Sequence, residues 1–242
     1  MKKLDFRQSY RDLVQSVKQK YAPDEAMHQA IGAEFEAFGI IERELLIQYG
    51  LQPNQYVIDV GCGSGRLAKP LSAYLKGPYL GTDVVPDLVD YARALVGRAD
   101  WRFEVTEGLS IPEHDEQANM VCFFSVFTHL LHEQSYIYLR EARRVLKPGG
   151  KIIFSFLDFA IPCHWDIFDG NIADIGGDHP LNMFISRDAI AAWSSHLDLE
   201  IEAMHDGDKP HIPLSQPVTL DDGRVMEGLG NLGQSVCVLV KR

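Results

Sequence analysis

The chain has 242 residues, of which 46% are hydrophobic and 24% charged, and this composition excludes a disordered or fibrous protein. Its net charge of −11 argues against DNA or RNA as the main partner, because binding a phosphate backbone requires a basic surface. The four cysteines form no CxxC pair, which argues against a disulfide framework and a structural zinc site. The N-terminus lacks the apolar run of a signal peptide, and the longest apolar stretch, residues 120–131, is too short to cross a bilayer. We therefore expect a cytoplasmic protein without a membrane partner.

Helical periodicity dominates the first fifty residues. Apolar residues recur at helical spacing over residues 3–21. Pro23 and the two acids after it suit the first turn of a second helix, which Gly50 and Pro53 end. The sequence predicts two helices before the first strand.

Strands and helices alternate in the rest of the chain. Strands are expected at residues 55–60, 79–82, 101–105, 120–125, 151–156, 197–204 and 235–240, and helices at 65–75, 86–96, 132–146 and 186–196. This order predicts a single domain, residues 1–242, with a Rossmann-like, doubly wound α/β sheet of seven strands. No helix separates the last two strands, so the last strand should be antiparallel. Long insertions at 157–185 and 206–234 are uncommon unless they are functional.

The most informative motif is a glycine-rich loop, Val57-Ile58-Asp59-Val60-Gly61-Cys62-Gly63-Ser64-Gly65, between a strand and a helix. Glycines allow a tight turn, and the free N–H groups of a helix N-terminus bind an anionic or ribose-bearing ligand. A nicotinamide-dependent oxidoreductase is the weaker alternative, because its motif requires a glycine where Arg66 stands.

Asp83 stands at the end of the second predicted strand, in the sequence Gly81-Thr82-Asp83. A carboxylate at this position can accept hydrogen bonds from the 2′ and 3′ hydroxyls of a ribose. Its alternative role is to cap the helix that follows.

Four segments resemble class I S-adenosylmethionine-dependent methyltransferases, in particular the small-molecule enzymes of the ubiquinone-biosynthesis type. They are VIDVGCGSGRL, GTDVVPDLVDYARA, SIPEHDEQANMVCFFSVFTHL and EARRVLKPGGKIIFSF, and they span roughly residues 55–156 in the order of the family. The resemblance implies S-adenosylmethionine as cofactor, S-adenosylhomocysteine as product and a helical lid formed by residues 1–50. The cofactor-binding residues that it implies are Asp59, Gly61, Gly63 and Gly65 for the methionine end, Asp83 for the ribose, Val84, Glu107 and Gly108 for the adenine, and Ser125 near the methionine. It also implies that Phe127 to Leu130 line the passage to the substrate.

The activity that this resemblance implies is methyl transfer to an oxygen or nitrogen of a small-molecule acceptor. Alignment of nucleophile, methyl carbon and sulfur can lower the barrier by ~7–11 kcal/mol, and a general base adds only about 3–5 kcal/mol. His129 is the candidate base or substrate contact, although it could instead cap the next helix.

The 157–185 insertion, with His164 and Trp165, is expected either to wall the acceptor pocket or to form a solvated loop. The histidines show no metal-binding spacing, so no metal is expected. A cofactor-binding protein, or a methyltransferase acting on protein or RNA, is the alternative function. The oligomeric state cannot be inferred from the sequence.

Overall fold

A computed structural model describes residues 6–32, 34–175 and 182–242. Three helices precede the first strand: α1 (Phe6–Lys20), α2 (Pro23–Gln29) and α3 (Phe35–Gln48). The predicted second helix is therefore wrong in one respect, since it is two helices. Gly32 and Glu34 have φ values of 93° and 65°, and this left-handed backbone cannot continue an α-helix.

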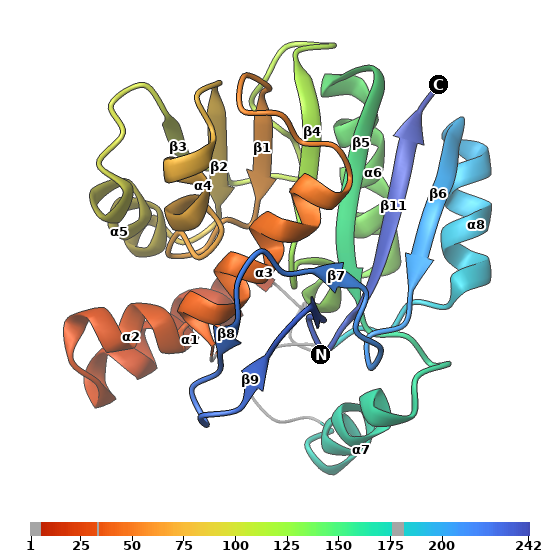
Figure 1. Cartoon of the computed structure of the whole chain (residues 1–242). Helices are drawn as coiled ribbons and strands as arrows, with labels where there is room; N and C mark the ends of the chain where they lie inside the picture. Colours follow the sequence, from red (N-terminus) through yellow and green to blue (C-terminus); the bar gives the residue numbers. More distant parts are fainter. Residues whose placement is uncertain (1–5, 33, 176–181) are drawn as a thin grey trace.

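Seven strands form the central sheet, in the order β3-β2-β1-β4-β5-β11-β6 (Figure 1). Their bounds are β1 (Val57–Val60), β2 (Tyr79–Asp83), β3 (Arg102–Val105), β4 (Ala118–Phe123), β5 (Leu146–Phe156), β6 (Leu199–His205) and β11 (Ser235–Lys241). Strands β1 to β5 pair in parallel, and β11 is antiparallel to both β5 and β6. The predicted Rossmann-like sheet with an antiparallel last strand is confirmed. From β1 the chain adds β2 and β3 toward one edge of the sheet, and it then returns to place β4 on the other side of β1. The strand order thus reverses between β1 and β4, and ligands bind at such a switch point.

Strand β5 begins earlier than the sequence predicts. Helix α6 (His132–Val145) ends where expected, but Lys147-Pro148-Gly149-Gly150 belongs to β5 rather than to a loop. Leu146 already pairs with Ala118, and the register shifts before Met120 pairs with Lys151. Proline and glycine are unusual within a strand except at edges and bulges. The register shift shows that the ladder is irregular here, which is how β5 includes them.

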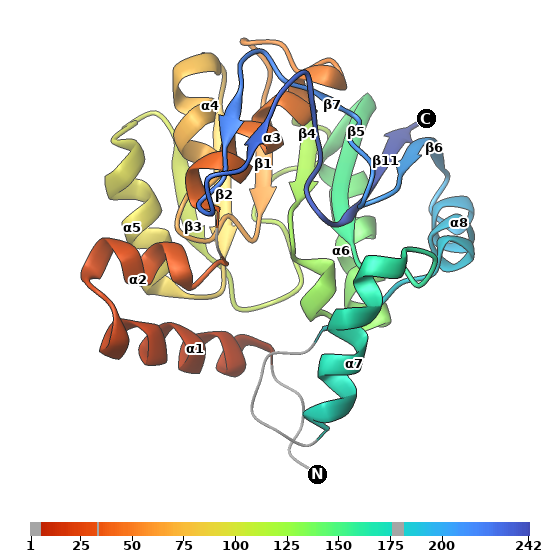
Figure 2. The same ribbon diagram turned by 60° about the horizontal axis from the view of Figure 1, so that its bottom comes forward.

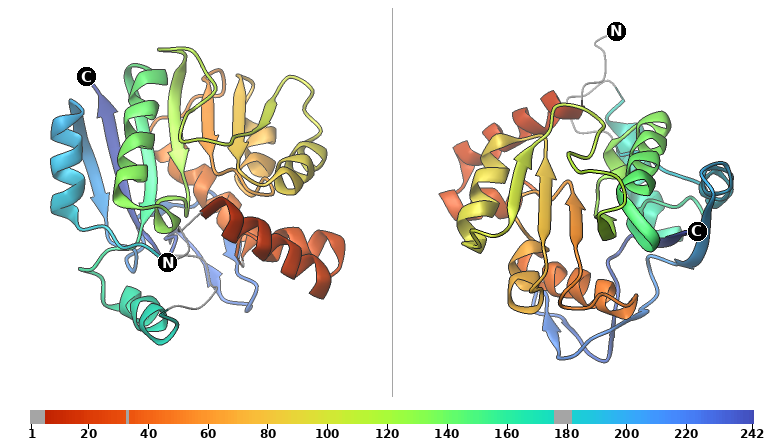
Figure 3. Two further views of the ribbon diagram at one scale, coloured as in Figure 1. Left: turned by 180° about the vertical axis from the view of Figure 1, so that it is seen from behind. Right: turned by 90° about the horizontal axis from the view of Figure 1, so that it is seen from above.

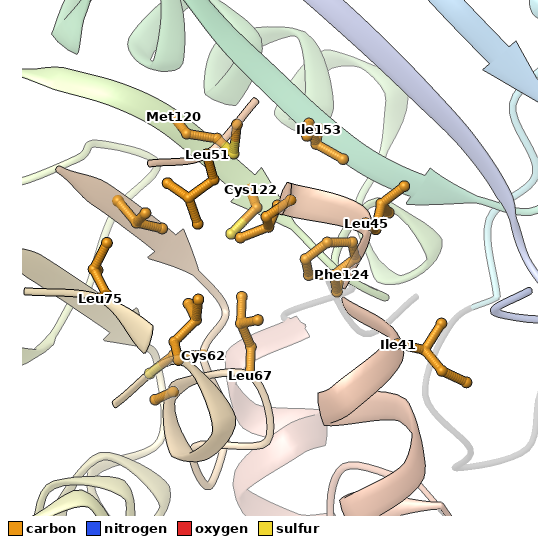
Figure 4. Close-up of a cluster of buried hydrophobic side chains, with 14 of the residues drawn as sticks. Ile41, Leu45, Leu51, Cys62, Leu67, Leu75, Met120, Cys122, Phe124 and Ile153 are labelled. Atoms are coloured by element: carbon orange, nitrogen blue, oxygen red, sulfur yellow. The ribbon is translucent and has the colours of Figure 1, made fainter. Parts of the chain in front are cut away.

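The helices cover the two faces of the sheet. Helices α3, α4 (Ala68–Tyr74) and α5 (Pro86–Val96) pack on one face, and α6 and α8 (Arg187–His196) pack on the other (Figures 1 and 3). Successive strand residues alternate between the faces, as a pleated sheet requires. A hydrophobic core therefore lies on each face of the sheet. Figure 4 shows the core on the α3 side, in which Met120, Cys122 and Ile153 from the strands meet Ile41 and Leu45 of α3.

Both predicted insertions contain regular structure. The first contains the short helix η2 (Pro162–His164) and helix α7 (Trp165–Ala173), which projects beyond the end of the sheet (Figure 2). The second contains the short strands β7 (Ile212–Pro213), β8 (Val218–Thr219), β9 (Val225–Met226) and β10 (Leu229–Gly230). It buries Ile212, Val218 and Leu220 in the core on the α3 side of the sheet. Within the described ranges, no helix has the length and apolar character needed to cross a membrane.

Candidate functional site

The carboxyl ends of β1, β2 and β4 surround a cavity. Helices α1, α3 and α6 also contribute to its wall, through Tyr10, Glu42 and Tyr138. The predicted site residues that line the cavity are Asp59, Gly61, Gly63, Asp83, Val84, Ser125, His129 and Leu130.

The glycine loop follows β1 and has positive φ at Gly61 (75°) and Gly63 (53°). A Cβ atom on Gly61 would lie 2.4 Å from Cγ2 of Val126, and one on Gly63 would lie 2.7 Å from Cγ2 of Ile31. Gly65 is absent from the cavity lining, and a Cβ there would lie 3.1 Å from Cβ of Ala92 in α5. Glycine is therefore needed at Gly61 and Gly63 both for their positive φ and because neighbouring side chains approach them closely.

Asp83 ends β2 with its carboxylate held between two backbone groups. Oδ2 accepts the N–H of Gly63 at 3.0 Å, and Oδ1 accepts the N–H of Val85 at 2.9 Å. The second bond caps the start of α5, so the capping alternative describes part of the role of this residue. Burial raises the pKa of Asp83, and backbone hydrogen bonds from Val85, Gly63 and Val84 oppose that rise. Each oxygen keeps a lone pair for a further donor.

Three charged side chains lie together in the cavity wall near the glycine loop. Arg66 pairs with Glu42 of α3 at 2.6 Å, and both side chains are at most 10% exposed. Burial raises the pKa of Glu42, and Arg66 opposes that rise. Asp59 accepts a 2.7 Å hydrogen bond from the Tyr79 hydroxyl, and its burial raises its pKa to about 7. Arg66 and Glu42 thus neutralise each other, and Asp59 keeps a proton below about pH 7.

His129 and Tyr10 form another part of the cavity wall. Their ring centroids lie 5.1 Å apart at an interplanar angle of 73°. Tyr10 comes from α1, and burial, with Asp83 nearby, holds its pKa far above the usual range. Tyr10 is therefore a neutral phenol at physiological pH.

Sequence reasoning missed several residues of the cavity. Glu42 could have been found only as a charge within the apolar stripe of a helix, and Arg66 was considered only as a departure from the dehydrogenase motif. Thr106 and Tyr138 also line the cavity, and neither belongs to a motif.

The remaining predicted residues lie elsewhere. Phe127 is fully buried against Phe123 and Phe154, with ring centroids 4.8 and 4.9 Å away. Glu107 and Gly108 are exposed beside Thr106, and neither lines the cavity.

The two residues predicted from the 157–185 insertion also lie outside the cavity lining. His164 is buried, and its Nδ1 accepts the N–H of Asp158 at 2.9 Å while its Nε2 lies 3.0 Å from the carbonyl of Gly233. Trp165 is 43% exposed and donates its indole N–H to the carbonyl of Phe159 at 3.0 Å. His164 thus connects the two insertions, and Trp165 supports the first.

No metal centre is formed by the part of the chain that the structure describes, where no three His, Cys, Asp or Glu side chains are grouped to hold an ion.

Comparison with known proteins agrees with this geometry. Residues 57–150 match the family described as a methyltransferase domain. The ubiquinone biosynthesis O-methyltransferase of Xanthomonas oryzae pv. oryzae is 30% identical over 156 residues, which cover 60% of this chain and 63% of that protein. The malonyl-[acyl-carrier protein] O-methyltransferase of Hahella chejuensis is 30% identical over 142 residues, covering 57% of this chain and 48% of that protein. The chain thus matches less than two thirds of the length of these relatives.

Solved structures share the fold at low sequence identity. Magnesium protoporphyrin IX methyltransferase from Synechocystis, solved with bound SAH, has a TM-score of 0.65 at 12% identity, with 98% of each chain covered. A possible histamine N-methyltransferase from Thermotoga maritima has a TM-score of 0.62 at 16% identity, covering 98% of this chain and all of that one. At such identities the likeness shows the fold alone.

Proposed function

We propose, from the premise that residues 57–150 form a class I S-adenosylmethionine-dependent methyltransferase domain, that this chain methylates an oxygen or nitrogen atom of a small-molecule acceptor. The observation that carries the proposal is that one cavity joins the glycine loop, the carboxylate of Asp83 and the imidazole of His129. The relatives at 30% identity named as O-methyltransferases favour oxygen as the accepting atom.

The donor groups of the cavity fit an adenosyl cofactor. Asp83 keeps lone pairs for two ribose hydroxyls while Gly63 and Val85 hold its carboxylate in place. The apolar side chains of Val84 and Leu88 lie beside it, where a flat base can pack. S-Adenosylmethionine, when bound, supplies a methyl group that is already activated by the positive sulfur.

The main catalytic task of the protein is to align the acceptor with that methyl group. The backbone of the glycine loop and the Asp83 carboxylate hold the cofactor, and α1 with Tyr10 closes the cavity on the side of His129. Alignment alone can lower the barrier by ~7–11 kcal/mol. The enclosure also limits access of water, and the acceptor has to fit the space that remains, which favours a small molecule.

His129 would take the proton that a hydroxyl or amine acceptor loses. Its ring lines the cavity, where an acceptor can approach it. A neutral imidazole accepts a proton near neutral pH, and such a base accelerates transfer by ~10²–10⁴-fold. His129→Gln should therefore lower kcat more than it weakens cofactor binding.

Binding and transfer can be measured separately. Titration calorimetry should show that the wild-type chain binds S-adenosylmethionine and S-adenosylhomocysteine. Asp83→Ala should weaken both at least tenfold, because it removes charge-assisted hydrogen bonds of about 1.5–3 kcal/mol. Transfer of a labelled methyl group to a panel of small phenols, carboxylates and amines would identify the acceptor class.

Asp87→Ala is the matched control, since Asp87 is the next acid along the chain and forms an exposed ion pair with Lys18 instead of lining the cavity. A wild-type chain that binds neither cofactor form would refute the proposal. A label found only on protein or RNA would refute the small-molecule acceptor.

A further inference from the structure

A closed ring of hydrogen bonds links the end of β4 to the start of β11. The backbone N–H of Ser125 donates to Oγ of Ser155 at 2.8 Å, and this hydroxyl contacts Oε1 of Gln234 at 2.7 Å. Nε2 of Gln234 returns to Oγ of Ser125 at 3.1 Å, which closes the ring. Ser125 lines the cavity, whereas Ser155 and Gln234 stand behind it.

The ring determines which atoms donate. The Ser125 N–H can only donate, so Ser155 Oγ accepts there and has its own hydrogen left for Oε1 of Gln234. In this structure Gln234 directs its amide N–H to Ser125. The hydroxyl of Ser125 accepts this bond, and its own hydrogen stays available for the cavity, since no acceptor for it occurs among the described residues.

The backbone of Ser125 shows that this orientation is imposed by its surroundings. Its φ is 58°, a left-handed conformation that is rare for a residue other than glycine and occurs often at ligand sites. The carbonyl of Ser125 accepts the Thr128 hydroxyl at 2.9 Å, so both backbone groups of this residue are held.

The order of the sheet indicates what Ser125 faces. Asp83 follows β2, the glycine loop follows β1 and Ser125 follows β4, and these strands are adjacent in the order β2-β1-β4. A cofactor with its ribose at Asp83 that crosses the glycine loop brings its opposite, amino-acid end to β4. That end carries a carboxylate, which accepts hydrogen bonds and donates none.

We infer that Gln234 is a positioning residue that holds Ser125 as a hydrogen-bond donor to the amino-acid end of the bound cofactor. The inference rests on the proposed function. It assigns a role in the site to the last part of the 206–234 insertion, and Gln234 lies outside the residues that match the methyltransferase family.

Comparing the binding of two ligands distinguishes this positioning role from general structural support of the cavity. S-Adenosylhomocysteine has the amino-acid end, and 5′-methylthioadenosine keeps the adenosine and the sulfur but lacks that end. Gln234→Glu preserves the shape of the side chain, but above pH 7 its carboxylate accepts only, so Ser125 must donate its hydrogen to it. Calorimetry at pH 8 should show at least tenfold weaker binding of S-adenosylhomocysteine and less than twofold change for 5′-methylthioadenosine.

A double variant removes the effect of the added charge. Ser125→Ala should also weaken S-adenosylhomocysteine selectively, and adding Gln234→Glu to it should cause less than a further twofold loss. A further loss as large as in the wild-type background would mean that the charge acts directly, which would overturn the inference. Gln52→Glu adds the same charge at an exposed glutamine and should change neither ligand.

Gln234→Met extends the test to a variant with no charge and no donor, in case Gln234→Glu does not fold. It should weaken S-adenosylhomocysteine at least threefold and leave 5′-methylthioadenosine unchanged. Equal weakening of both ligands, or no change in either, would overturn the inference. Failure of the wild-type chain to bind either ligand would instead refute the proposed function.

Discussion

Gly61 is restricted both by its positive φ and by a close contact with Val126, and comparison with Gly97 separates the two effects. Its φ of 75° costs an L-residue about 1–2 kcal/mol, and a Cβ would also overlap Cγ2 of Val126 at 2.4 Å. At Gly97, the C-cap of α5, φ is 64° but no atom lies within 4 Å of the added Cβ. Only Gly61 is thus restricted by the segment that follows β4.

Gly61→Ala should lower the free energy of unfolding by about 1–3 kcal/mol more than Gly97→Ala, because overlap in a packed region adds to the backbone cost. Urea denaturation of both variants measures this difference. Adding Val126→Ala to Gly61→Ala makes room for the new methyl group and should restore part of the loss. Equal destabilisation by the two glycine substitutions would contradict this interpretation.

Among the elements around the cavity, α1 depends on a narrow apolar contact. Val14 and Val17 pack with Met27 of α2 and Leu88 of α5. Its ion pair to the domain, Lys18–Asp87, is exposed, and exposed pairs contribute at most about 1 kcal/mol. Helix α1 should therefore open locally at a lower free energy than the sheet.

Val14→Ala tests the independence of α1. Val14 is fully buried, and losing its two methyl groups should cost at least about 1.5 kcal/mol. Native-state hydrogen exchange should accelerate at least tenfold in residues 6–20, while amides of β1, β4 and β5 keep their rates. Asp12→Ala, an exposed position on the same helix, should change neither. Equal acceleration in the sheet would show that α1 and the sheet unfold together.

The stability of the whole molecule should depend on pH through its buried acids. Burial raises the pKa of Asp59 from 3.8 to about 7, and it raises that of Glu42 as well. Between pH 4 and 7 the folded chain keeps a proton on Asp59 that the unfolded chain releases. The folded state then binds more protons, so the free energy of unfolding falls as pH rises through this range.

Asp59→Asn should remove the part of this dependence that Asp59 contributes. The amide oxygen can still accept the Tyr79 hydroxyl, but the side chain no longer titrates. Urea unfolding at pH 5 and pH 7 should show the wild type losing stability relative to the variant, by at most about 1.4 kcal/mol per pH unit. Parallel profiles would mean that Asp59 is ionised in the folded chain throughout this range.

The sequence by itself predicted the alternation of strands and helices, the antiparallel last strand, the glycine loop and Asp83. Each of these depends on residues close together in the chain, where apolar periodicity and glycine conformation act locally. Local patterns also account for the errors. The second predicted helix is broken by the left-handed backbone at Gly32 and Glu34. The segment Lys147-Pro148-Gly149-Gly150 resembles a loop although it lies within β5.

Only the tertiary structure decided which distant side chains share the cavity. Glu42 meets Arg66 because α3 packs beside the glycine loop, and Gln234 reaches Ser125, 109 residues away, because β11 pairs with β5 next to β4. His164 and Trp165 have side chains suited to binding a ligand, yet they form hydrogen bonds with the backbone. His164 bonds to Asp158 and to the distant Gly233, and Trp165 bonds to Phe159. Such contacts follow from the order of the strands and the packing of helices on them, and no local pattern encodes these.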